Sequence, residues 1–89
     1  MMNVEKRVDW NAVLKNRHMQ KASIDFALGL LSRDDFYSYA VFCNVGGQVR
    51  KLIRNNGAVK ARELTRKALK RRRVLNRHNL TNPLVYAQL

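Results

Sequence analysis

The sequence contains very little of what covalent or metal chemistry requires. It has one cysteine, Cys43, so no disulfide can form within the chain. Its two histidines, His18 and His78, lie far apart, and no Cys/His spacing matches a zinc site. Cys43 has no partner base in the sequence that would activate it as a nucleophile. The sequence therefore predicts a protein that is not an enzyme and that holds no metal or cofactor.

Long apolar runs, Gly/Ser-rich linkers and internal repeats are also missing. The longest apolar run is far shorter than the roughly 20 residues that a membrane span needs. The first residues include Glu5 and Asp9 and lack the hydrophobic run of a secretory signal. We therefore expect one domain of 89 residues, located inside the cell, with no membrane partner.

Acidic residues are scarce, and their distribution divides the chain. The sequence has 6 acidic residues and 18 Lys and Arg residues, which gives a formal net charge of +12. Residues 1–49 hold 6 basic and 5 acidic residues, whereas residues 50–89 hold 12 basic residues and 1 acidic residue. Repulsion at this charge opposes a compact state and favours an anionic partner. We therefore expect a neutral packing half over residues 1–49, a nucleic-acid-binding half over 50–80 and an extended tail over 81–89.

Apolar residues recur at helical spacing along most of the chain, which predicts an all-α fold of about five helices around a small core. Asp9 is placed to cap a short first helix. Segment 21–32 is the most apolar element, and we expect it to form one helix at the centre of the core. Its inward stripe is predicted to comprise Ile24, Ala27, Leu28 and Leu31.

The later helices are predicted from their caps and breakers. Ser32 and Asp35 have the spacing of a capping box, and this third helix should turn Phe36, Tyr39, Ala40 and Cys43 inward. Successive glycines in segment 44–47 should break it. A short helix should then end at Asn55-Asn56-Gly57, and a long basic helix should follow until Pro83 ends helical character.

The last helix is strongly amphipathic on a helical wheel. Its apolar arc contains Ala58, Ala61, Leu64, Ala68, Leu69 and Leu75, and most of its cations lie on or beside the opposite face. Only Glu63 opposes this charge, so most i, i+4 pairs repel by a few tenths of a kcal/mol. Arginine also matches phosphate geometry with two parallel hydrogen bonds. The candidate nucleic-acid-binding residues are Arg50, Lys51, Arg54, Lys60, Arg62, Arg66, Lys67, Lys70, Arg71, Arg73 and Arg77.

The aromatic residues lie mostly in the neutral half, away from this charge. Trp10, Tyr37, Tyr39 and Tyr86 could stack on bases, as in proteins that bind single strands. Their position favours core packing or contact with neighbouring proteins of a large complex instead. The alternative for the basic helix is that its charged face contacts only solvent and has no ligand.

The segment "RELTRKALKRRRVLNRHNL", residues 62–80, resembles the basic helices of small ribosomal proteins of the bacterial and organellar type. The resemblance covers residues 50–80 and rests largely on composition. It implies a structural subunit that contacts ribosomal RNA phosphates, with RNA favoured over DNA. It also implies that the protein is located in ribosomes, either in the cytoplasm or in the mitochondrial matrix.

A DNA-binding alternative stays open. The segment "FYSYAVFCNVGGQVRKLIRN", residues 36–55, could form a helix, a turn and a recognition helix. Gln48, Arg50 and Arg54 would then read base edges. A regulator or phage-type protein of this kind would act as a dimer, because its half-sites are related by symmetry.

Overall fold

A computed structural model describes residues 7–73, which form an all-α fold. The helices are α1 (Trp10–Leu14), α2 (Arg17–Ala27), α3 (Arg33–Phe42) and α4 (Gly46–Arg71). Gly57, at φ 80° and ψ 165°, interrupts α4 and divides it into the segments 46–56 and 58–71. With that division the described residues contain five helical segments, so the predicted fold class is confirmed. Leu75, Arg77 and the predicted tail over 81–89 lie outside the described residues.

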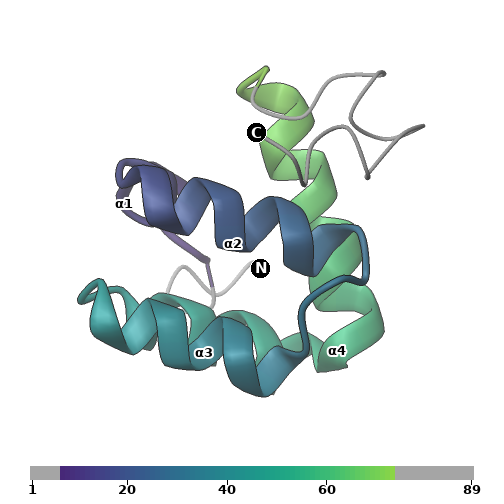
Figure 1. The fold of residues 1–89 in the computed structure, drawn as a ribbon. Coiled ribbons are helices and arrows are strands. Elements are labelled where there is room, and N and C mark those ends of the chain that lie inside the picture. The colour runs from purple at the N-terminus through teal and green to yellow at the C-terminus, as the bar shows by residue number, and fades with distance from the viewer. Residues whose placement is uncertain (1–6, 74–89) are drawn as a thin grey trace.

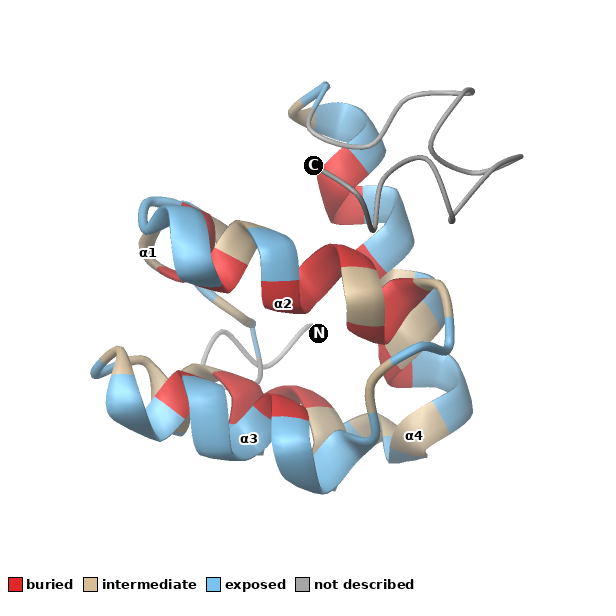
Figure 2. Ribbon diagram, viewed as in Figure 1, coloured by how far each residue is buried: buried red, intermediate tan, exposed pale blue. Residues whose placement is uncertain are grey.

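The helices enclose one small core. α2 lies above α3 in Figure 1, the first half of α4 runs along α3, and its second half rises past the C-terminal end of α2. Figure 2 shows that the buried positions face this enclosed space, while the outer surfaces of α3 and α4 are exposed. At the centre, the rings of Phe26 and Phe36 stack with their centroids 4.3 Å apart. The largest fully buried side chains also include Met19, Leu52, Leu69, Val13 and Val49.

Short polar side chains begin the first three helices. Asp9 accepts a hydrogen bond from the backbone N–H of Ala12 at 3.1 Å, as the sequence predicted. Ser32 accepts from the N–H of Asp35 at 3.1 Å, which confirms the predicted start of α3. Asn16 caps α2 through the N–H groups of His18 and Met19, a start that the sequence analysis missed.

The prediction of one helix over 21–32 was wrong at its end. α2 stops at Ala27 because Gly29 adopts φ 80°, and the N–H of Leu30 then bonds to the carbonyl of Asp25 at 2.8 Å. This is the Schellman arrangement, in which a left-handed residue closes the helix. The chain beyond it is a loop, which leaves Leu30 55% exposed and Leu31 half-buried.

The connection after α3 also differs from the prediction. Asn44, at φ 63°, ends α3 in the same way, while Gly46 and Gly47 begin α4 instead of breaking a helix. A Cβ on Gly46 would lie 2.8 Å from Cγ2 of Val41, so glycine permits the close approach of the two helices. Tyr39, expected to face inward, is 51% exposed, while Phe36 and Ala40 are buried as predicted.

Candidate nucleic-acid interface

Ten of the eleven candidate nucleic-acid-binding residues lie within the described chain, on α4 or just after it. Their side chains are exposed except for Lys51 and Arg62, which are half-buried. The interruption at Gly57 separates Arg50, Lys51 and Arg54 from the others. Glu63 is the one acid in α4, and it pairs with Lys67 at 3.5 Å on the surface. An exposed pair of this kind contributes little to stability.

Two of the candidates, Arg62 and Arg66, are bonded inside the protein. Arg62 donates hydrogen bonds to the carbonyl oxygens of Phe26 and Leu31, at 2.5 and 3.0 Å. Arg66 donates to the carbonyl of Ala27 at 2.9 Å. These carbonyls lie at and just beyond the C-terminal end of α2, where a helix carries partial negative charge. Both arginines therefore join α4 to α2, a role that the helical wheel did not indicate.

A second set of cations lies on the other flank of the buried face of α4. Lys60, Lys67 and Arg71 follow one another at i, i+7 and i+11, with Leu64 between them, and this spacing puts them on one stripe of the helix. The stripe borders a groove of about 420 Å³ between α4 and the residues around α1. Among the described residues, the groove is lined by Arg7, Val8, Trp10, Leu52, Asn56, Lys60, Leu64, Lys67, Ala68 and Arg71.

Trp10 packs against the core as predicted, but it does not lie away from the basic residues. It was expected to lie away from the charge, because it belongs to the neutral half of the chain. The fold brings it into one groove with Lys60, which is fifty positions further along the chain. No sequence pattern predicts that the two residues share a groove, because this depends on how α1 packs against α4.

A smaller cluster of arginines lies where α3 meets the first half of α4. A pocket of about 510 Å³ is lined there by Arg33, Asp34, Tyr37, Arg50, Ile53 and Arg54. Arg33 was not among the predicted site residues, and it lies 3.7 Å from the carboxylate of its neighbour Asp34. Arg50 and Arg54 therefore extend the basic surface beyond the kink, next to an aromatic ring.

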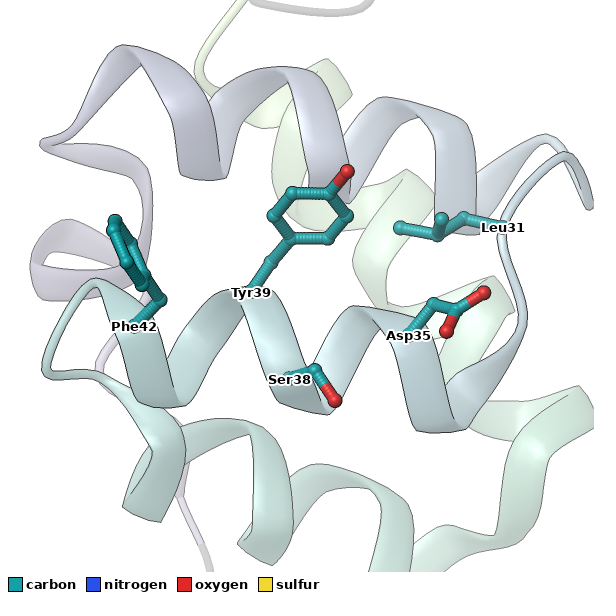
Figure 3. Close-up of a pocket in the computed structure, with 5 residues that line it drawn as sticks. All are labelled: Leu31, Asp35, Ser38, Tyr39 and Phe42. Carbon is teal, nitrogen blue, oxygen red and sulfur yellow. The ribbon is translucent and has the colours of Figure 1, made fainter.

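One exposed face of α3 carries the apolar side chains of Tyr39 and Phe42, beside Asp35 and Ser38, and is distinct from the cationic surfaces. Figure 3 shows the side chains of Tyr39 and Phe42 extending from α3, with Leu31 at the edge of the same pocket. Phe42 is 86% exposed, the largest value among the exposed hydrophobic side chains of the described chain. This surface agrees with an N-terminal half that contacts other proteins, a role that stays a prediction.

The segment that could form a helix-turn-helix, residues 36–55, contains most of α3 and the first turns of α4. Its connection, residues 43–45, is as short as that motif requires. However, α3 and the first half of α4 run side by side in opposite directions, as Figures 1 and 3 both show. A DNA-binding pair of this type instead crosses at a wide angle, which lets the second helix enter a groove. The arrangement in this protein is an antiparallel helical hairpin.

Two other features are absent from residues 7–73. No group of three or more His, Cys, Asp or Glu side chains in this part of the chain could hold a metal ion. No helix over the same residues has the length and apolar character to cross a membrane. Comparison of the chain with protein-family models, with curated proteins and with solved structures gave no match.

Proposed function

We propose that this protein binds nucleic acid, RNA in preference to DNA, through the exposed cations of α4 and of the residues just after it. The observation that supports it most directly is that most of these cations have no partner among residues 7–73. Within residues 7–73, no acid or hydrogen-bond acceptor pairs with the side chains of six exposed cations. They are Arg50, Arg54, Lys60, Lys70, Arg71 and Arg73.

Unpaired cations in this number favour a polyanionic partner over bulk water. Each repels its neighbours along the helix, and phosphate groups remove that repulsion while counterions are released. Because Arg62 and Arg66 are bonded to α2, we assign the phosphate contacts to the six cations without partners. The surface is then a contact for phosphates and RNA shape, which suits a structural subunit of a ribonucleoprotein such as a ribosome.

Two features favour RNA over duplex DNA. The antiparallel packing of α3 on α4 does not present a projecting recognition helix to a major groove. The basic helix also resembles those of ribosomal proteins. In such an assembly, inside the cell, the exposed apolar face of α3 would be available for a neighbouring protein.

A salt series tests the proposal. The full chain is titrated with a labelled structured ribosomal RNA fragment, with single-stranded RNA and with duplex DNA at several salt concentrations. We expect the logarithm of the affinity to fall linearly with the logarithm of salt. Lys60→Gln and Lys70→Gln should each lower the magnitude of the slope by about one unit. Arg66→Gln should change the slope less, because Arg66 already donates to Ala27.

Two results would overturn the proposal. Absence of binding to every nucleic acid would show that the cations face solvent or another kind of partner. A preference for one duplex DNA sequence by orders of magnitude would support the alternative of a DNA-binding regulator instead.

A further inference from the structure

We infer that the groove between α1 and the second half of α4 binds an unpaired base of a single-stranded nucleic acid, with Trp10 as the surface on which the base stacks. The inference rests on the proposed function and deepens it. It assigns the recognition of bases to a groove of about 420 Å³, in addition to the phosphate contacts along the helix.

The groove combines the two features that single-strand binding requires. Proteins that bind single strands pair a cationic surface, which follows the phosphates, with aromatic rings, on which bases stack. Lys60 and Arg71 supply unpaired charge from one stripe of α4, Lys67 lies between them with Glu63 as its partner, and Trp10 supplies the ring. At 1.5 Å per residue, the stripe from Lys60 to Arg71 extends about 16 Å, enough for several phosphates of an extended strand.

Trp10 is held in place by the residues on either side of it. The backbone N–H of Asp9 donates to Oε1 of Gln48, near the start of α4, at 2.8 Å. Asn11 accepts from the guanidinium of Arg72, at the end of α4, at 3.3 and 3.1 Å. Trp10 itself is half-buried against the core while it lines the groove. A ring positioned in this way loses little entropy when a base stacks on it, because most of its freedom is already lost.

The chemistry points to an unpaired base and not to a duplex. In a duplex both faces of each base are covered by its neighbours, so no face is available to a protein ring without unstacking. A base in a single strand or a loop is already accessible, and every base has a π-face that can stack on an indole. RNA loops and single strands are therefore the expected ligands under the proposed function.

The experiment uses the intrinsic fluorescence of the full chain. Trp10 is the one tryptophan in the sequence, so its emission reports on this groove alone. A short single-stranded RNA should quench the emission. A strand of the same length and charge that lacks bases, and polyglutamate, should leave it nearly unchanged. Binding of each ligand is followed in parallel by anisotropy of a label on the ligand.

Matched substitutions locate the effect. Lys60→Gln and Lys70→Gln each remove one exposed lysine from α4, but only Lys60 lines the groove. Both variants should weaken binding, so each is compared at RNA concentrations that saturate it. There Lys60→Gln should reduce the quenching, whereas Lys70→Gln should reach the quenching of the unaltered chain, because Lys70 does not line the groove. Trp10→Leu should weaken binding of the single strand roughly tenfold and binding of duplex RNA little. Since the quenching is measured on the unaltered chain, it does not depend on how Trp10→Leu folds.

The possible outcomes separate this inference from the proposed function. If single-stranded RNA binds by anisotropy while the emission of Trp10 stays constant, the stacking site is wrong and the proposed function stands. If the abasic strand or polyglutamate quenches as strongly as RNA, the groove recognises anions and not bases, which also overturns the inference. If no nucleic acid binds, the proposed function fails and the stacking site fails with it.

Discussion

The guanidinium of Arg62 lies over the ring of Phe26, with its central carbon 4.4 Å from the ring centroid. The same group donates hydrogen bonds to the carbonyls of Phe26 and Leu31, and the ring of Phe26 stacks on that of Phe36. A cation of α4 therefore contacts the central aromatic pair of the core. It also neutralises the negative end of α2, so its main role is within the fold.

Replacement of Arg62 tests this structural role. Arg62→Gln should lower the free energy of unfolding by about 2 kcal/mol, because it removes two charge-assisted hydrogen bonds and a cation–π contact. Urea denaturation at fixed salt measures the change. Lys70→Gln removes the same charge from an exposed site and should stay within about 0.5 kcal/mol of the unaltered protein. Equal stabilities for the two variants would show that the contacts of Arg62 do not stabilise the fold.

The kink in α4 depends on one glycine. Gly57 lies at φ 80° and ψ 165°, a backbone conformation that residues other than glycine rarely adopt. Gly57→Ala should therefore lower the free energy of unfolding by roughly 1–3 kcal/mol, through backbone strain alone, because an added Cβ meets nothing within 4 Å. Thermal and urea unfolding measure the loss.

Gly47 provides the matched control for that substitution. It lies in the first turn of α4, its φ is not in the left-handed region, and an added Cβ there also meets nothing within 4 Å. Gly47→Ala should leave stability unchanged or raise it by up to about 1 kcal/mol, since alanine favours helix. A loss at Gly47 equal to that at Gly57 would contradict the assignment of the strain to the kink.

Asp25 should make stability depend on pH. Burial raises the pKa of this carboxyl above its ordinary value, and Lys21 opposes the shift only in part. The folded chain therefore holds the proton of Asp25 more tightly than the unfolded chain does. Its contribution to stability is largest below the unfolded pKa and is lost as the pH rises through the folded pKa.

We accordingly expect Asp25→Asn to be more stable than the unaltered protein at pH 7, with a difference that shrinks as the pH falls toward 3. Thermal unfolding of both proteins across this range measures it. Asp34→Asn removes the same charge from an exposed position in the first turn of α3, where an acid is favourable, so it should lower stability slightly at pH 7. A destabilised Asp25→Asn at neutral pH would contradict the direction of the shift.

Local sequence signals predicted the helices well. The caps at Asp9 and Ser32 depend on side chains that bond to N–H groups three residues away, so they can be predicted from neighbouring residues in the sequence. Helix ends were predicted less well. Gly29 ends α2 although the apolar spacing continues to Leu31, because the conformation of one residue outweighs periodicity.

The candidate site was predicted only as a set of charges. The sequence indicates that α4 is basic, but it treats Lys60, Arg62 and Arg66 alike. In the structure these residues lie on different sides of the same helix and meet different neighbours. One flank meets the carbonyls of Phe26 and Ala27, and the other borders the groove that contains Trp10. Which flank meets which neighbour follows from the packing of α1 and α2 on α4.

The sequence by itself determined the fold class, the imbalance of charge and most helix starts, because each depends on composition or on residues within one turn of each other. The tertiary structure alone decided which cations of residues 7–73 remain without partners in this part of the chain, and which ring lies beside them. The reason is physical. Arg62 bonds to Phe26 and lies over its ring, and Trp10 shares a groove with Lys60. The residues of each pair lie far apart in the chain. Their distance is set only when the core closes.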